Sequence, residues 1–414
     1  MNGPTAPARA MDLEHLEPLI QSRSIDALSV SELVALFRDD LNLADNLPDG
    51  EHQVDPRDGA VVTFNRARAR RLHDQSFPPL ARDTAPCPIC LGQTTGVLDV
   101  APLSDGFTFI NKNLFPIVRQ LDPITALPTT ALSKAAHEDL GPTDRFAYGL
   151  HFLQWTSSRH DDDWHSLPRA DRVVVFQRLA ALERKLLTES EGFMPISEPW
   201  NVARSTRGYV SIIKNYGRAV GGSLSHGHQQ IAFSNIMPRR FFHNWQFFEQ
   251  RREVFSSFLL RCTPPELVVR DYGAAALVVP YFMRRPYDMM LLVKDPRREY
   301  LSDLAAEELA AVADGWHDAM RAILAVMPRL GRAPAFNVTV NNGPGAGLYC
   351  EFLPFTQETG GFEHLGLWVC QDEPRNVAAR VREALDMDDM PAAAPAATTD
   401  GAAPEAGDAD GSDQ

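Results

Sequence analysis

Two histidines and a glutamine follow a glycine-rich turn in the segment between Asn215 and Gln230. The motif is His226-Gly-His228-Gln-Gln230, and an apolar run resumes directly after it. Because side chains two residues apart on a strand share a face, we expect His226, His228 and Gln230 to project together. A neutral imidazole is a nucleophile, an amide can hold an anionic oxygen, and glycines let a backbone approach a ligand closely. The spacing therefore favours phosphate chemistry.

A second motif, Cys87-Pro-Ile-Cys90, places two thiols on a tight turn. A redox motif of this spacing requires a helix directly after it, whereas Leu91–Gly96 has the composition of a loop. The pair is therefore predicted to bind a metal, and a tetrahedral zinc site needs two more ligands. The three other cysteines are scattered and are predicted to be buried structural thiols: Cys262, Cys350 and Cys370.

The Asn215–Gln230 pattern resembles the active-site motif of the galactose-1-phosphate uridylyltransferase family, a branch of the histidine-triad superfamily. That branch carries Asn, a turn of small residues and then His-x-His-x-Gln. Histidine-triad hydrolases have a third histidine where Gln230 stands here. The resemblance covers roughly residues 52–385. It implies an α+β fold of tandem duplicated histidine-triad-like domains, in which an antiparallel sheet is flanked by helices.

An internal repeat agrees with such a duplication. Each half is predicted to contain a strand, a capped helix, a second strand, a glycine turn and a third strand. Superposing the two turns places Tyr349 and Glu351 where His226 and His228 lie. We therefore expect the second half to be catalytically silent and to hold no metal. The predicted strands and helices are 151–155, 168–187, 208–214 and 225–233 in the first half, and 289–294, 303–326, 336–342 and 347–353 in the second.

The predicted domains follow from this repeat and from the composition at the two ends. Residues 1–50 are an appended helical extension, in which Ser29 and Glu32 can form a capping box. The two histidine-triad-like domains are 51–236, which carries the metal site and the catalytic histidine, and 237–385. Residues 386–414 are acidic and rich in Ala, Pro and Asp, so we expect a disordered tail.

The resemblance supplies the missing zinc ligands. It implies one zinc ion bound by Cys87, Cys90, His160 and His226. His151 and His165 lie close to His160 in the sequence, and spacing alone does not separate the three.

The resemblance also implies residues that bind a nucleotide-sugar. Arg68 and Arg71 match arginines that contact this substrate, although an arginine cluster can equally form a solvated face. Phe362 and Glu363 match a late segment that reaches the substrate across a homodimer interface, and a plain turn is the alternative. The remaining candidates, in the nucleoside pocket and beside the glycine turn, are Asn113, Asn215, Gly221, Gly222 and Ser223.

The predicted activity is nucleotidyl transfer by double displacement. His228 attacks the α-phosphorus of a nucleoside diphosphate sugar, and Gln230 donates to a non-bridging oxygen of the nucleotidyl-histidine. A sugar 1-phosphate, foremost galactose 1-phosphate, then accepts the nucleotide from UDP-glucose. The alternatives are a phosphorylase resembling ADP-glucose phosphorylase, in which phosphate is the acceptor, and a zinc-stabilised nucleotide-binding module without turnover.

Composition excludes other classes of protein. The chain has 40 basic and 54 acidic residues, a net charge of −14, and eight of the acids lie from Asp386 onward. The remaining body is only mildly acidic, which argues against a nucleic-acid partner. No apolar run reaches membrane-spanning length and the first residues lack a signal-peptide core, so we expect no membrane partner and a cytoplasmic location.

Overall fold

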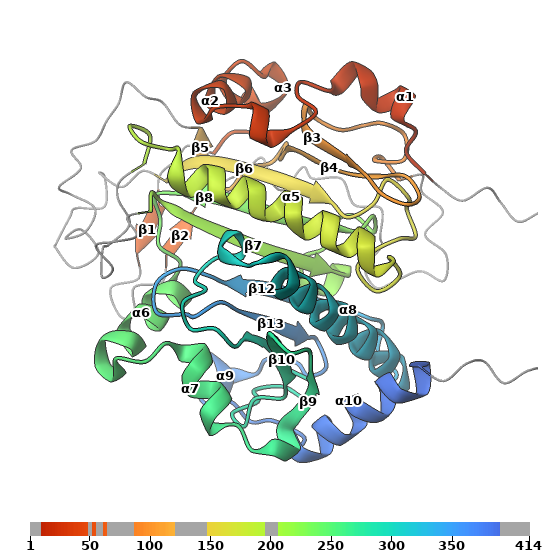
Figure 1. The fold of residues 1–414 in the computed structure, drawn as a ribbon, viewed down its shortest axis with the longest axis vertical. Coiled ribbons are helices and arrows are strands. Elements are labelled where there is room, and N and C mark those ends of the chain that lie inside the picture. The colour runs from red at the N-terminus through yellow and green to blue at the C-terminus, as the bar shows by residue number, and fades with distance from the viewer. Residues whose placement is uncertain are drawn as a thin grey trace, which may run out of the picture.

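The computed structural model describes residues 10–48, 52–54, 61–63, 87–120, 147–194 and 206–389, which form an antiparallel sheet flanked by helices (Figure 1). Arg68 and Arg71 lie outside these ranges. None of the helices in the described ranges is long and apolar enough to cross a membrane.

The strands of the main sheet form two sets, one from each half of the chain. The sheet order is β3-β4-β6-β8-β7-β12-β13-β11-β10-β9; all of these neighbours are antiparallel, and the short β5 pairs with β6 in parallel. The strands are β3 (Val97–Pro102), β4 (Phe107–Lys112), β5 (Arg119–Gln120), β6 (Tyr148–Trp155), β7 (Tyr209–Tyr216), β8 (His228–Ser234), β9 (Val268–Asp271), β10 (Ala275–Val278), β11 (Met289–Val293), β12 (Phe336–Asn341) and β13 (Tyr349–Pro354). A separate two-stranded sheet contains β1 (His52–Val54) and β2 (Val61–Thr63).

Two long helices lie side by side on one face of this sheet, α5 (Arg169–Thr188) and α8 (Ala306–Arg329) (Figure 1). The other helices are α1 (Leu13–Leu16), α2 (Val30–Arg38), α3 (Leu41–Ala44), α6 (Arg239–Arg251), α7 (Phe255–Cys262), α9 (Gly361–His364) and α10 (Pro374–Asp389). Single 3₁₀ turns are at Glu17–Leu19, Ile25–Ala27, Arg218–Val220, Pro265–Leu267 and Leu301–Asp303.

The strand order is symmetric about its centre, which confirms the tandem duplication. From the outer edges inward, β3, β4, β6, β8 and β7 of the first half correspond to β9, β10, β11, β13 and β12 of the second. The halves join where β7 pairs with β12, with Asn215 opposite Asn337 and Lys214 opposite Val338. Each half thus contributes its last hairpin to the middle of one continuous sheet.

One hydrophobic core runs through both halves. Trp164 and Phe176 from the first half pack against Trp316 of α8, with ring centroids 5.4 Å from Trp316 in each case. Trp316 in turn contacts Phe352 of β13 at 5.4 Å. Because these rings are buried together, neither half can expose its inner face without opening the core of the other.

The N-terminal extension packs on the first half. The capping box is confirmed: the backbone N–H of Ser29 donates to Glu32 at 2.7 Å, and that of Glu32 donates to the Ser29 hydroxyl at 3.2 Å. The apolar stripe of α2 is buried, and Phe37 lies 5.0 Å from Phe152 of β6. Met11 joins a smaller core that includes Cys87. The extension therefore covers both the sheet and the cysteine turn.

Two predicted boundaries are wrong. Strand β8 begins at His228 and not at residue 225, so His226 lies in the preceding turn and does not share a strand edge with His228 and Gln230. Helix α10 continues to Asp389, so its last four residues belong to the segment predicted to be a disordered tail. Residues 390–414 lie outside the described residues.

Candidate active site and metal centre

The structure brings Cys87, Cys90, His160 and His226 together, with one ligand atom from each lying within 4.8 Å of the others. The Cys90 sulfur is 3.5 Å from Nδ1 of His160 and 3.6 Å from Nδ1 of His226. Nδ1 of His226 is 3.8 Å from the Cys87 sulfur. In a tetrahedral zinc site with Zn–S of about 2.3 Å and Zn–N of about 2.0–2.1 Å, sulfur and nitrogen ligands lie about 3.6 Å apart. The cluster therefore has the donor set and spacing of a tetrahedral metal site.

Local geometry explains why the two cysteines face one point. The turn after Cys87 closes through backbone hydrogen bonds from Leu91 to Cys87 at 3.2 Å and from Gly92 to Ile89 at 2.9 Å. Gly92 has φ +72°, a conformation that favours glycine, so the chain can turn back without strain. The turn brings both sulfurs within 4.8 Å of one another, and residues 91–96 form no helix, as their composition predicts.

The imidazole of His226 is held in the tautomer that a metal requires. Its Nε2 lies 2.8 Å from the carbonyl oxygen of Ser157, which can only accept, so Nε2 carries the proton and Nδ1 faces the sulfurs. Burial lowers the pKa of His226 to about 4, although the Ser157 carbonyl opposes this shift. The ring is therefore neutral at physiological pH, as a metal ligand must be.

The structure also shows which of the three candidate histidines lies in the cluster. His160 is in the cluster, and its Nε2 lies 3.2 Å from the Ser225 hydroxyl. His151 is turned elsewhere: its Nδ1 accepts from the Ile117 N–H at 3.2 Å and its Nε2 lies 3.2 Å from the Asn113 amide. His165 is not part of the cluster.

His228 lies at the start of β8 beside a cavity of about 180 Å³. Its Nδ1 lies 2.8 Å from the carbonyl oxygen of His226, so Nδ1 must donate and Nε2 is the unprotonated nitrogen. The His228 ring packs on Trp155, with centroids 4.8 Å apart, and Trp155 also contacts the His226 ring at 5.4 Å. Trp155 thus packs against both histidines, and the backbone partner of His228 defines which of its ring nitrogens is unprotonated.

Two charged residues outside the motifs, Lys214 and Asp163, stabilise the backbone at this histidine. Lys214 lines the cavity, yet its side chain is only 1% exposed. Its ammonium lies 2.7 Å from the buried carboxylate of Asp163 and donates to the His228 carbonyl at 3.2 Å. Burial opposes ionisation of Asp163, but Lys214 and the Trp164 N–H outweigh it and lower the pKa of that carboxyl group.

A pattern in the sequence could have revealed Lys214. In β7 the residues Val210, Ile212 and Lys214 alternate onto the buried face. A lysine at the third position of a buried apolar alternation must have an internal anion as its partner, because an unpaired buried charge is costly.

The remaining predicted substrate residues differ in whether they line this cavity. Asn215 lines the cavity and accepts from the Asn337 amide at 2.8 Å. Gly217, Leu224 and Ser225 of the glycine turn line the cavity, whereas the predicted residues Gly221, Gly222 and Ser223 do not. Gln230 is buried two residues beyond His228 and does not line the cavity that the structure describes.

Three other predicted residues do not reach this cavity. Asn113 is buried and accepts from the Phe115 N–H at 2.9 Å. Phe362 is 61% exposed in α9, and Glu363 accepts backbone N–H groups of Gly360 and Val369 at 2.9 and 3.2 Å. These contacts show a local capping role for Glu363. A contact of this segment with the substrate across a dimer interface stays a prediction.

In the second half, Tyr349 and Glu351 occupy β13, the counterpart of β8. The Tyr349 hydroxyl donates to the Asn244 side-chain carbonyl at 2.9 Å, and Glu351 accepts from the Asn341 amide at 3.0 Å. Both side chains are thereby engaged with neighbours from the protein. The absence of a second metal site stays a prediction.

Comparison with known proteins agrees with this architecture. No protein-family model matches the chain. ADP-glucose phosphorylase from Arabidopsis thaliana is 22% identical to it over 358 residues, which cover 80% of this chain and 92% of that protein.

Among solved structures, a uridylyltransferase matches with a TM-score of 0.60 and 20% identity, over 82% of this chain and 100% of that one. An ADP-glucose phosphorylase from Arabidopsis thaliana with bound ADP-glucose matches with a TM-score of 0.53 and 17% identity, over 80% and 98%. The fold expected from the resemblance to the uridylyltransferase family is therefore confirmed. These relatives are enzymes of the nucleotidyltransferase and phosphorylase class.

Proposed function

We propose that this chain transfers the nucleotide of a nucleoside diphosphate sugar to a phosphate-bearing acceptor through a nucleotidyl-histidine on His228. The observation that carries the proposal is the hydrogen bond from Nδ1 of His228 to the His226 carbonyl, 2.8 Å long, beside the cavity. It leaves Nε2 unprotonated and therefore nucleophilic.

The proposed reaction has two displacements. In the first, Nε2 of His228 forms a bond to the α-phosphorus, the bond from that phosphorus to the bridging oxygen breaks, and sugar 1-phosphate leaves. The ring gains positive charge while Nδ1 keeps its proton, and the His226 carbonyl stabilises that charge. In the second, an oxygen of the acceptor phosphate attacks the same phosphorus and the P–N bond breaks. Gln230 is proposed to donate to a non-bridging oxygen, and Asn215 to position the nucleotide.

We propose zinc as the metal of the four-residue cluster. With Cys87, Cys90, His160 and His226 as ligands the ion would have no open coordination position, so it would stabilise structure and would not activate water. His226 is both a proposed ligand and the acceptor of the His228 hydrogen bond. Metal binding at His226 would thus orient the nucleophile two residues away.

Two acceptors are candidates, and different relatives favour each. The structural match to a uridylyltransferase favours transfer from UDP-glucose to a hexose 1-phosphate such as galactose 1-phosphate. The sequence match to ADP-glucose phosphorylase favours transfer of a nucleotide from ADP-glucose to phosphate. Exposed apolar residues near Phe362, among them Leu365 and Leu367, are consistent with a homodimer in which this segment meets the partner subunit.

The test is covalent trapping. Wild-type protein incubated with UDP-glucose or ADP-glucose labelled in the α-phosphate should acquire label that is stable to base and labile to acid. His228→Ala should abolish labelling, whereas His15→Ala, at an exposed histidine of the extension, should not. Phosphate and hexose 1-phosphate are then added separately, and only the true acceptor should remove the label from the protein. Normal exchange in His228→Ala would rule out the double displacement, and an unlabelled wild type would favour a nucleotide-binding module.

A further inference from the structure

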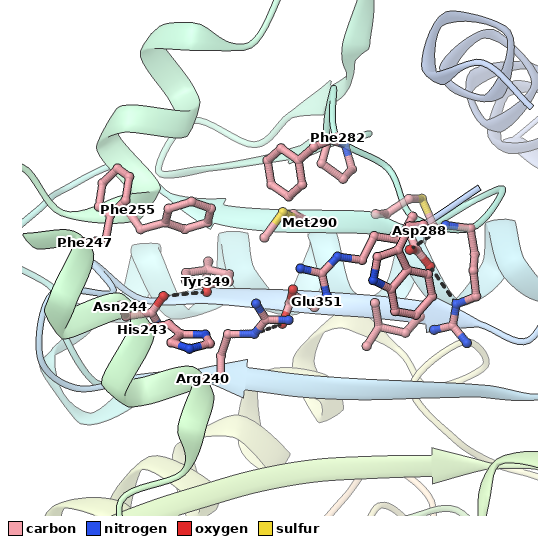
Figure 2. Close-up of a pocket in the computed structure, with 16 residues that line it drawn as sticks. Arg240, His243, Asn244, Phe247, Phe255, Phe282, Asp288, Met290, Tyr349 and Glu351 are labelled. Carbon is pink, nitrogen blue, oxygen red and sulfur yellow. Dashed lines mark hydrogen bonds and ion pairs between the residues drawn. The ribbon is translucent and has the colours of Figure 1, made fainter. Parts of the chain in front are cut away.

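A second cavity, of about 280 Å³, lies in the second half between helix α6 and strands β11 and β13 (Figure 2). Tyr349 and Glu351 line it, as His226 and His228 line the cavity of the first half. The duplication has therefore produced a cavity on the corresponding strand of each half. Tyr349 is the first residue of β13, as His228 is the first residue of β8, so a phenol stands where the first half has the His228 imidazole, two residues later than the sequence overlay predicted. The imidazole that lines this cavity is that of His243, from α6.

The charges around this cavity favour an anion. Three arginines line it, Arg240, Arg284 and Arg285, against two carboxylates. Arg240 lies 3.4 Å from Glu351, and Arg285 lies 3.7 Å from Asp288. Arg284 has no carboxylate within 4 Å among the residues that the structure describes, and its guanidinium stacks on Trp368 at 5.4 Å. A guanidinium held by its face keeps its in-plane N–H groups available for a phosphate or carboxylate.

The cavity also contains buried polar atoms that make no hydrogen bond within the described ranges. They are Nδ2 of Asn244, and Nε of Arg285 and Oδ1 of Asp288, which form the ion pair at 3.7 Å. Asn244 is 4% exposed and Asp288 is 5% exposed, so these atoms have little access to bulk water. Burial also raises the pKa of Asp288 to about 7, against the opposing effect of Arg285, which reduces the negative charge of the wall. A buried polar atom without a hydrogen bond can be satisfied by a bound water, ion or ligand.

An aromatic wall faces this polar side, and Figure 2 shows Phe247, Phe255 and Phe282 along it. The Phe255 ring lies 5.3 Å from Phe247 and 6.3 Å from Phe282. Phe282 is 39% exposed, which places it at the opening. A ring or apolar group of the ligand would pack against this wall, because aromatic side chains favour stacked and edge-on contacts.

We propose that this second-half pocket binds a phosphate ester that carries a planar group, with its phosphate on Arg284 and its ring on the phenylalanine wall. The site is separate from the cavity beside His228 and goes beyond the proposed nucleotidyl transfer.

The test is a calorimetric titration of the full chain with AMP, which has both a phosphate and a planar base. Arg284→Ala should raise the Kd at the second-half pocket by about tenfold or more, as expected for losing a charged hydrogen bond. Arg184→Ala removes an exposed arginine of α5, outside the pocket, and should leave the Kd unchanged. Adenosine and glucose 1-phosphate, which each lack one half of the recognised chemistry, should both bind at least about tenfold more weakly than AMP.

Two further variants locate the bound AMP. Trp368→Phe should remove the change in tryptophan fluorescence that accompanies binding. Asn215→Ala alters the first-half cavity and should leave this binding intact. Wild-type affinity in Arg284→Ala, or loss of all AMP binding in Asn215→Ala, would overturn the proposal. Equal affinity for AMP and glucose 1-phosphate would show that the aromatic wall does not bind the planar group, which would also overturn the proposal. None of these measurements requires turnover, so their failure is distinct from failure of the proposed function.

Discussion

A single methyl group added at Gly227, between the two histidines of the motif, should disrupt the whole site. A Cβ at this position would lie 2.6 Å from Cγ of Asp163 and 2.9 Å from both of its carboxylate oxygens. Ordinary carbon contacts are about 3.5–4.0 Å, so about 1 Å of space is missing. The φ angle of Gly227 is not in the left-handed region, so the effect of Gly227→Ala is steric.

Asp163 cannot move away without losing its partners. Its carboxylate is held by Lys214 at 2.7 Å and by the Trp164 N–H at 2.8 Å, and Asp163 is only 4% exposed. Overpacking alone costs about 1–3 kcal/mol, whereas separating a buried ion pair costs about 3–5 kcal/mol. We therefore expect Gly227→Ala to lower the free energy of unfolding by about 3–5 kcal/mol. Because the methyl pushes on the peptides of His226 and His228, metal content and labelling should fall as well.

The assay is urea unfolding followed by tryptophan fluorescence, with metal analysis of the same samples. Gly361→Ala is the matched control, since nothing lies within 4 Å of a Cβ at Gly361, and its effect should stay within about 0.5 kcal/mol. Asp163→Ala removes the obstructing carboxylate, so the double variant with Gly227→Ala should be no less stable than Asp163→Ala alone. A loss below about 1 kcal/mol in Gly227→Ala, or additive losses in the double variant, would refute this reasoning.

The remaining predictions concern the metal, one buried carboxyl group and the C-terminus. Cys90→Ser should lose the bound metal in elemental analysis and lower the melting temperature, whereas Cys262→Ser, outside the cluster, should do neither. Glu183 accepts from the Ser302 N–H at 2.9 Å and from Asn342 at 2.7 Å, and burial raises its pKa from 4.5 to about 7. A raised carboxyl pKa means that the folded state binds the proton more tightly. The free energy of unfolding should therefore fall by about 3 kcal/mol as pH rises from about 4.5 to about 7. In Glu183→Gln, the urea midpoint should not show this part of the pH dependence. Deleting residues 390–414, which contain no bulky apolar residue after Met390, should leave calorimetric melting unchanged.

Several structural features of this protein follow from local patterns in its sequence. The capping box at Ser29 depends on residues three apart, and the turn between Cys87 and Cys90 depends on neighbours within one loop. The duplication was also visible, because each half repeats the same succession of strands, helix and glycine turn. Such features follow from backbone conformation and short-range hydrogen bonds, which the local sequence specifies.

Contacts between distant segments were decided only by the tertiary structure. Spacing could not choose among His151, His160 and His165, because the choice depends on how the chain leaves β6 and folds back to the cysteine turn. The exact start of β8 was likewise set by pairing, since His228 is its first residue and lies opposite Trp155 of β6.

The ion pair that stabilises the backbone at His228 also depends on contacts between distant segments. Lys214 and Asp163 lie 51 positions apart in the chain, yet they form a buried ion pair, and Lys214 also donates to the His228 carbonyl. A charge can be buried only where the fold brings an opposite charge and hydrogen-bond partners to it, and no local pattern contains that partner. The sequence by itself thus determined which residues could do chemistry. Long-range packing decided which of them meet, because burial and pairing are properties of the assembled sheet.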